Sequence, residues 1–364
     1  MHISEIETPA IMIDLDIMER NLRRVAEYAR HHDLRLRPHT KTHKIPALGR
    51  MQIELGAVGL TVAKVGEAEV MVTSGTPDLL VAYPVIGRRK LERLMQVARA
   101  ARVTVALDSV AAARQLSDAA REAQAAIGVL AEVDAGMGRV GVAPGEELLQ
   151  LIRNLERLPH LSFEGIEFYP GHIRGGDDGG RKEIDRLGAV VGEMLAGLRR
   201  AGIEARIVGG GSTPTLFHSH LVAGMNEIRP GTYIFNDKNT VVAGACAYDD
   251  CAASIHVTVV SIARPGQIII DGGSKTFSSD RLGGAGEATF GRLVEAPDAV
   301  FVKLNEEHGY VDVRRAGRDF AVGDRLRVIP NHICVAMNLH EQVYGFRGET
   351  VEQVWKVEGR GKLQ

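Results

Sequence analysis

The sequence predicts an α/β protein in which a (β/α)8 barrel of the TIM type is followed by a β-rich C-terminal domain. Two observations support this prediction. Up to about Asn239, short runs rich in Val, Ile and Leu alternate with longer segments of helical period, and this alternation requires parallel strands joined by helical crossovers. Beyond Asn239, short alternating or apolar runs are separated by turn signals. We therefore expect a barrel over residues 10–238 and a β domain over residues 239–364, with residues 1–9 packing against the β domain.

The predicted barrel strands are short, apolar and bounded by segments of helical period. They are Leu34–His39, Gly59–Ala63, Leu79–Pro84, Val103–Asp108, Ile127–Asp134, Phe163–Pro170, Ala205–Gly210 and Glu227–Phe235. Eight parallel strands with continuous apolar sequence favour a closed barrel. An open doubly wound sheet is the alternative for this region.

Amphipathic helices are predicted before and between these strands. They are Leu15–His32, Arg88–Ala101, Val110–Ala123, Gly145–Leu158 and Lys182–Ala201. In the second of them, apolar residues recur at spacings of three and four, which indicates one buried face. Asp14 or Asp16 is a plausible N-cap for the first helix.

The β domain is predicted from five runs without a long helical stretch between them. The runs are Ile255–Ile262, Gln267–Asp271, Val300–Asn305, Tyr310–Val313 and Arg325–Ile329. Turn signals such as Pro265-Gly266 and Gly323-Asp324 separate them. This pattern is typical of a sheet whose strands are joined by tight turns.

The composition excludes several classes of protein. Lys and Arg total 44 and Asp and Glu total 46, a net charge of −2, which argues against recognition of nucleic acid or a membrane surface by bulk charge. The sequence contains neither an export signal nor an apolar stretch long enough to span a membrane. Cys246, Cys251 and Cys334 are too few for a disulfide framework, so we expect a reducing, cytoplasmic compartment.

The densest cluster of functional side chains is Pro38-His39-Thr40-Lys41-Thr42-His43-Lys44, at the carboxyl end of the first predicted strand. Barrel active sites lie at that end of the strands. Like-charged neighbours and desolvation favour a neutral lysine amine, which can form a Schiff base with a carbonyl. Lys41 is the candidate, and a solvated basic loop is the alternative.

Two glycine-rich loops follow later strands. In Val208–Thr213, three glycines let the backbone approach an anion and the last two residues add hydroxyl donors; loops after the seventh and eighth barrel strands commonly hold phosphate. In Glu132–Gly141, Arg139 would keep a ring nitrogen unprotonated, because a guanidinium keeps its own protons. The alternatives are a turn without a ligand, and an Arg139 that lies on the surface or pairs with Asp134.

The segment Phe168–His172 ends a strand with an aromatic ring and an imidazole. Tyr169 could flank a planar cofactor, and His172 could act as a general base. The alternative is a buried tyrosine beside a hydrogen-bonded histidine.

The segment Pro330–Cys334 follows an apolar strand of the β domain. At alternate strand positions, His332 and Cys334 would share one face and reach one cation. Two protein ligands with room for water fit a catalytic metal site, and a thiolate favours zinc. The alternative is a small buried cysteine beside a satisfied core histidine.

Together these clusters resemble the D-threonine aldolase and D-serine dehydratase family, relatives of alanine racemase among fold-type III pyridoxal-phosphate enzymes. The resemblance extends from Thr8-Pro9-Ala10 to Pro330–Cys334, and Pro38–Lys44 is its most specific motif. It implies a barrel that carries pyridoxal 5'-phosphate and a β domain that carries a divalent metal (zinc, manganese or magnesium). It also implies a homodimer.

The resemblance implies roles for individual residues. Lys41 is similar to the Schiff-base lysine, Arg139 to the partner of the pyridine nitrogen, and His332 and Cys334 to the metal ligands. The remaining expected cofactor-pocket residues are His39, Tyr169, His172, the phosphate cradle of Gly210, Gly211, Ser212 and Thr213, and Tyr233 near the phosphate.

An enzyme of this kind is a lyase acting on β-hydroxy-D-amino acids, without a nucleic-acid or membrane partner. The favoured reaction is that of D-threonine aldolase, retro-aldol cleavage to glycine and an aldehyde, with Lys41 and His172 as catalytic residues. The alternative is a D-serine or D-3-hydroxy amino acid dehydratase that gives a 2-oxo acid and ammonia. Cys334 points to the dehydratase, because the family's aldolases tend to carry His-x-Asp and its D-serine dehydratases His-x-Cys. An amino-acid racemase or a non-catalytic pyridoxal-phosphate carrier comes third.

Overall fold

The computed structural model describes residues 1–175, 178–282 and 289–364. The chain forms two compact units, each assembled from separate segments. The barrel unit consists of Arg23–Gly231, Ala243–Ala245 and Gly361–Gln364. The sheet unit consists of Met1–Leu22, Thr232–Val242 and Cys246–Arg360. The predicted division of the sequence between residues 238 and 239 stays a prediction.

In the part of the chain that the structure describes, the barrel unit is built on eight parallel strands in the order β2-β9-β8-β7-β6-β5-β4-β3. Their bounds are β2 Arg35–Leu36, β3 Leu60–Val62, β4 Asp78–Val81, β5 Arg102–Leu107, β6 Ile127–Val133, β7 Leu161–Phe168, β8 Ile207–Gly210 and β9 Glu227–Ile228. The first and last strands of this order lie next to each other, which closes the sheet. The amide of Thr61 on β3 donates to the carbonyl of Pro38, and the carbonyl of Thr61 accepts the amide of Thr40, just beyond β2. The predicted (β/α)8 barrel is therefore confirmed, and the open-sheet alternative is wrong.

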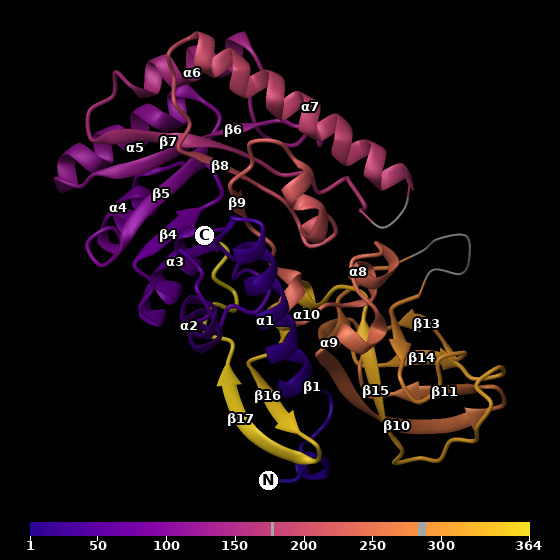
Figure 1. The fold of residues 1–364 in the computed structure, drawn as a ribbon. Coiled ribbons are helices and arrows are strands. Elements are labelled where there is room, and N and C mark those ends of the chain that lie inside the picture. The colour runs from indigo at the N-terminus through magenta and orange to yellow at the C-terminus, as the bar shows by residue number, and fades with distance from the viewer. Residues whose placement is uncertain (176–177, 283–288) are drawn as a thin grey trace. The chain divides into compact units, whose positions relative to one another are not determined.

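Helices connect these strands and pack outside them (Figure 1). They are α2 Pro46–Glu54, α3 Val65–Met71, α4 Arg88–Val97, α5 Val110–Ala123, α6 Glu146–Leu155 and α7 Asp178–Arg200, with 3-10 turns at Val72–Ser74 and Leu216–Leu221. In α4, Leu91, Leu94 and Met95 are buried, as their spacing predicts. The sequence missed α2 and α3, which are short.

The interior of the barrel contains a charged layer rather than a purely apolar core. Glu132 on β6, Glu167 on β7 and Glu227 on β9 occupy one register row together with Gly209 of β8, and all three carboxylates are buried. The guanidinium of Arg37, which follows β2, donates to the carboxylate of Glu227 on β9 and to the carboxylate of Asp78 on β4. We use the name charged layer for Arg37, Glu132, Glu167, Glu227 and Arg229.

Within the described ranges the sheet unit is built on nine strands, with the order β13-β14-β11-β10-β1-β16-β17 and with β15 joining β10 to β12. Their bounds are β1 Ala10–Asp14, β10 Ala253–Arg264, β11 Gln267–Ile270, β12 Gly291–Leu293, β13 Val300–Leu304, β14 Gly309–Asp312, β15 Arg325–Pro330, β16 Gln342–Arg347 and β17 Thr350–Lys356. Pairing is antiparallel except between β1 and β16. The predicted β-rich domain is therefore confirmed, although β1, β12, β16 and β17 were not predicted.

Short helices also occur in the sheet unit, namely α8 Lys238–Val242, α9 Ser274–Phe277, α10 Ile333–Leu339 and 3-10 turns at Ile3–Glu5, Thr232–Ile234 and Tyr248–Asp250. The N-terminal segment packs into this unit, with Ile6, Ala10 and Met12 clustered on Phe346. Helix α1, Leu15–His31, runs from the sheet unit into the barrel unit. The carboxylate of Asp14 accepts the amide of Ile17, so Asp14 is the predicted N-cap. Among the described residues, no helix is both long and apolar enough to cross a membrane.

Candidate functional site

Lys41 and Arg139 meet at one aromatic ring at the carboxyl ends of the barrel strands. The Lys41 ammonium nitrogen lies 5.7 Å from the centroid of the Tyr169 ring, and the Arg139 guanidinium carbon lies 4.9 Å from the same centroid. The three residues follow β2, β6 and β7, respectively. The barrel unit therefore gathers three residues that the sequence singled out separately, and each cation is within cation–π range of the ring.

The other basic groups around Lys41 are engaged in the fold. Lys44 pairs with Glu67 at 3.2 Å, and both side chains are buried. His43 contacts the Gln52 amide and accepts the amide of Ile45, and burial lowers its pKa to about 4. The predicted alternative of a solvated basic loop is wrong for these residues, and Lys41 is the half-exposed amine of the segment.

His39 is buried beside Lys41. Its Nδ1 accepts the amide of Lys41 at 3.3 Å. Burial first, and then the charges of Lys41 and Arg229, hold the pKa of His39 well below its usual range. A neutral imidazole at this position orients the Lys41 backbone without adding charge.

His172 lies near the loop that carries Arg139. A methyl group placed on Gly136 would come 3.4 Å from the His172 Nε2 atom, and His172 itself is exposed. Asp134 accepts the amides of Gly136 and Gly138, and these hydrogen bonds hold the pKa of its carboxyl below the usual range. Asp134 therefore shapes this glycine-rich loop, and no ion pair with Arg139 is found among the described residues. Arg139 itself is exposed, as the surface alternative predicted.

The glycine-rich loop after β8 provides a cradle for a polar group. Gly211 adopts a φ of +88°, which favours glycine, and a Cβ on Gly210 would lie 2.5 Å from the Phe168 ring. The amide of Ser212 donates to the Thr215 hydroxyl. Among the described residues, the buried Thr213 hydroxyl has no hydrogen-bond partner. An unpaired buried hydroxyl is costly, so this cradle fits a cofactor phosphate.

The charged layer contains residues that the sequence reasoning missed as functional candidates. Arg229 lies 3.0 Å from Glu167 and donates to the carbonyl of Phe168. Within the described part of the chain, Glu132 Oε2 is buried and has no hydrogen-bond partner. Burial first, and then repulsion by Glu167, raise the pKa of Glu132 to about 7. Burial likewise raises the pKa of Glu167. The sequence signal that could have identified these residues is the presence of acidic side chains within otherwise apolar strands.

His332 and Cys334 lie together in the sheet unit, but not on a strand as predicted. His332 is the residue before α10 and Cys334 is in its first turn, and their side chains are hydrogen-bonded. The Cys334 contact first, with Asp237 and Asp280 adding to it, raises the pKa of His332 to about 9. The His332 Nδ1 atom lies 3.2 Å from an Asp280 carboxylate oxygen. We call His332 and Cys334 the metal pair.

The donor chemistry of this pair fits a divalent cation with open positions. An imidazole and a thiol both lose a proton when they bind a metal, and two protein ligands leave room for solvent or substrate. The described ranges contain no group of three or more His, Cys, Asp or Glu side chains placed to hold a metal. Tyr233, which was predicted near the phosphate, is buried in the sheet unit, and the Thr232 hydroxyl lies 3.6 Å from the Cys334 sulfur.

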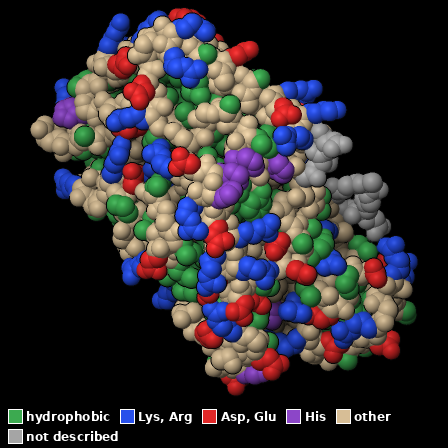
Figure 2. Space-filling model, in the orientation of Figure 1, with side chains coloured by type: hydrophobic (Ala, Val, Ile, Leu, Met, Phe, Trp, Pro, Cys, Tyr) green, Lys and Arg blue, Asp and Glu red, His purple; other side chains and the backbone are tan. Residues whose placement is uncertain are grey.

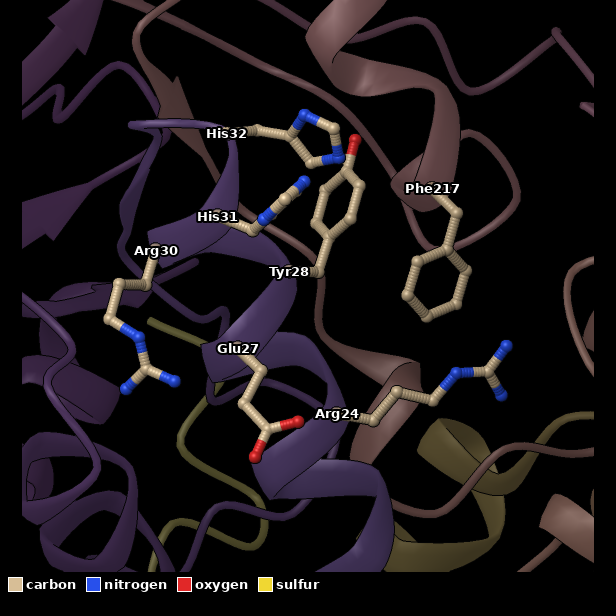
Figure 3. A pocket seen from close by; sticks show the side chains of 7 residues that line it. All are labelled: Arg24, Glu27, Tyr28, Arg30, His31, His32 and Phe217. Atoms are coloured by element: carbon tan, nitrogen blue, oxygen red, sulfur yellow. The ribbon is translucent and has the colours of Figure 1, made fainter.

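A separate cavity on the barrel unit, of about 470 Å³, contains none of the predicted site residues. Figure 3 shows its lining, with Arg24 beside Phe217 and with Tyr28 between Phe217 and His32. The His32 ring stacks on His220 at 3.9 Å, and Figure 2 shows histidines gathered on the face that it draws.

Both parts of the chain match known protein families. Residues 13–239 match the alanine racemase N-terminal domain, and residues 252–346 match the putative serine dehydratase domain. The chain is 33% identical over 368 residues to a D-threonine aldolase of Arthrobacter sp, which covers 99% of this chain and 94% of that protein. It is 32% identical to a D-threo-3-hydroxyaspartate dehydratase of Delftia sp. (strain HT23), over 90% of this chain and 91% of that protein.

A solved structure has the same architecture over the same length. The crystal structure of D-threonine aldolase from Filomicrobium marinum matches with a TM-score of 0.92 at 33% identity, over 99% of this chain and 98% of that one. The chain therefore belongs to the alanine racemase-like family that includes the D-threonine aldolases and D-serine dehydratases.

Proposed function

We propose that the protein is a pyridoxal-phosphate- and divalent-metal-dependent lyase of β-hydroxy-D-amino acids, with D-threonine aldolase activity as the favoured reaction. The observation that carries the proposal is the meeting of Lys41 and Arg139 at the Tyr169 ring. An amine, a guanidinium and a flat ring at the carboxyl end of a barrel suit a planar, electron-poor cofactor. The aldolases and dehydratases among its relatives support the lyase chemistry.

The residues of the barrel unit would hold the cofactor as follows. Lys41 would bind it covalently through its amine, with Tyr169 and His39 beside it and Arg139 as the partner of the ring nitrogen. Gly210, Gly211, Ser212 and Thr213 would cradle its phosphate. Tyr233, which belongs to the sheet unit, stays a candidate near that phosphate from the family resemblance alone. When bound, pyridoxal phosphate supplies an electron sink that weakens the bonds to the substrate's Cα.

The residues of the chain then decide which bond breaks. His332 and Cys334 would hold a divalent cation (zinc, manganese or magnesium) that acts as a Lewis acid on the substrate's β-hydroxyl. In the aldolase reaction, His172 would take the proton of that hydroxyl as a general base. The Cα–Cβ bond breaks with its electron pair left on Cα, and Cα then takes up a proton to give glycine beside the aldehyde.

Cys334 favours a second candidate, the dehydratase. In that reaction the amine of Lys41 takes the proton from Cα, and the β-hydroxyl then leaves. The hydroxyl leaves as water, and hydrolysis of the resulting imine gives a 2-oxo acid and ammonia. Both reactions therefore need the same hydroxyl but break different bonds. A metal-independent racemase would not use His332 and Cys334. A non-catalytic cofactor carrier would need only the barrel unit.

The test offers D-threonine and D-serine separately to the protein loaded with pyridoxal phosphate and metal, and identifies the products. Glycine with acetaldehyde from D-threonine supports the aldolase. Ammonia with 2-oxobutyrate or pyruvate supports the dehydratase, and racemised amino acid without cleavage would overturn both.

We also propose a homodimer in the cytoplasm, with a small β-hydroxy-D-amino acid as substrate. The family resemblance supports the dimer, and the three free thiols suit a reducing compartment. Light scattering on the purified protein measures the dimer mass directly, and a monomer at micromolar concentration would refute it.

A further inference from the structure

Asp280 lies directly beside the metal pair in the sheet unit, and the proposed function assigns it no role. A carboxylate oxygen of Asp280 lies 3.2 Å from the Nδ1 atom of His332. A carboxylate accepts hydrogen bonds and does not donate them, so this contact places a proton on Nδ1. When the imidazole is neutral, its other nitrogen, Nε2, then carries the electron pair that a cation binds.

The main chain of Asp280 is anchored next to His332. The side-chain amide of Asn331 donates to the carbonyl of Asp280 at 2.8 Å and also to the carbonyl of Thr289. Asn331 is buried and immediately precedes His332 in the chain. The amide of Asp280 donates to the hydroxyl of Ser278 at 3.1 Å. These bonds involve the backbone of Asp280, so they hold its side chain near the imidazole and do not depend on the carboxylate itself.

The backbone on the other side of His332 is held as well. The amide of Ile333 donates to the carboxylate of Asp237 at 3.1 Å, and Asp237 is buried. Since both neighbours of His332 in the chain are fixed, the freedom that remains is rotation of the imidazole about its side-chain bonds. The contact with Asp280 restricts that rotation.

We propose that Asp280 is a positioning residue of the metal site: its carboxylate keeps a proton on Nδ1 of His332 and leaves Nε2 for the cation that Cys334 also binds. A carboxylate on the second nitrogen of a metal-bound imidazole fixes the orientation of the ring and makes the ring a better electron donor. This role rests on the proposed function, because it takes His332 as a metal ligand.

The size of the effect follows from the exposure of the two side chains. The side chains of His332 and Asp280 are 38% and 48% exposed, so water can replace the carboxylate at Nδ1 and screens its charge. Loss of such a partner weakens metal binding by about 10- to 100-fold. The partial exposure places the expected effect at the lower end of that range.

The first measurement titrates Zn²⁺ into metal-depleted protein that carries pyridoxal phosphate, and follows the heat of binding. Asp280→Ala should bind Zn²⁺ about tenfold more weakly than the unmodified protein. Asp280→Asn should lose less affinity, because its amide oxygen can still accept the Nδ1 proton. The matched control is Asp298→Ala, which removes another exposed carboxylate of the sheet unit and should leave the affinity unchanged.

Thermal unfolding of the metal-free proteins separates positioning from stability. Asp280→Ala should unfold at the same temperature as the unmodified protein, because the backbone anchors of Asp280 remain. A lower unfolding temperature would make Asp280 a structural residue and would overturn the proposal.

The second measurement is a crystal structure of the zinc-loaded, unmodified protein. Zinc should lie on Nε2 of His332, with the Asp280 carboxylate within hydrogen-bond distance of Nδ1. Zinc on Nδ1, zinc bound by Asp280 itself, or equal Zn²⁺ affinity of Asp280→Ala and the unmodified protein would each refute the role of Asp280 and leave the proposed function intact. If His332→Ala binds Zn²⁺ as tightly as the unmodified protein, the metal site of the proposed function fails together with the role of Asp280.

Discussion

Replacing Glu132 by glutamine removes an ionisable group from the charged layer while keeping its shape. The Glu132 carboxyl is buried, with one oxygen left without a partner among the described residues. Its pKa rises from 4.5 to about 7. The folded protein therefore holds a proton on Glu132 that the unfolded chain has already released at neutral pH.

The size and sign of the effect follow from linkage. The difference between 4.5 and about 7 corresponds to about 3 kcal/mol of stability. Because the pKa is higher in the folded state, this stability is fully present below pH 4.5 and is lost as the pH rises through 7. About 2 kcal/mol of it should disappear between pH 5.5 and pH 8.5, and Glu132→Gln should not show this loss.

The assay is urea unfolding of the cofactor-free protein, followed by far-ultraviolet circular dichroism at several pH values between 5.5 and 8.5. The free energy of unfolding of Glu132→Gln should rise relative to the unmodified protein as the pH increases. Glu227→Gln is the matched control, since it weakens the partner of Arg37 and should destabilise the protein at every pH. If the curves of Glu132→Gln and the unmodified protein stay parallel, Glu132 does not hold a proton at neutral pH.

Three further predictions concern the site. Borohydride should fix pyridoxal phosphate to Lys41, and a Lys41→Ala protein that is still labelled, as judged by peptide mapping, would refute that assignment. A chelator should abolish turnover without removing the cofactor absorbance, because the metal pair and Lys41 bind different groups; full activity in chelator would exclude a metal from the reaction. Lys44→Met should lower the free energy of unfolding by about 3–5 kcal/mol because it leaves the buried Glu67 carboxylate without its cation. The double variant with Glu67→Gln should recover most of that loss. An equal loss of stability in the single and the double variant would show that the ion pair is not the cause.

The barrel was predictable because its signal is local and repeated. The strands lie in short runs rich in Val, Ile and Leu, and α5 begins and ends where its periodicity predicts, at Val110 and Ala123. Lys41, Arg139 and Tyr169 were each placed at a strand end by the same pattern, since parallel strands bring their carboxyl ends to one rim. Their meeting at one ring follows from that topology.

The parts that the sequence did not predict depend on contacts distant in the chain. Strand β1 is five residues long and becomes a strand because β10 and β16 pair with it on both sides. His332 and Cys334 were expected on a strand from their spacing, but the strand ends at Pro330 and α10 begins at Ile333. The elevated pKa of Glu132 depends on Glu167 and on burial, and neither is visible in one segment alone.

The position of β1 has a consequence for biosynthesis. Its partners β10 and β16 end at Arg264 and Arg347, so the ribosome makes the first strand of this sheet long before its neighbours exist. Residues 23–231, which form most of the barrel unit, emerge in between and can fold first. Until synthesis passes Arg347, the apolar segment Ala-Ile-Met-Ile of β1 has at least one unpaired edge that another chain can bind. Both edges of β1 therefore stay unpaired until β10 has been made, and the second edge stays unpaired until β16 has been made.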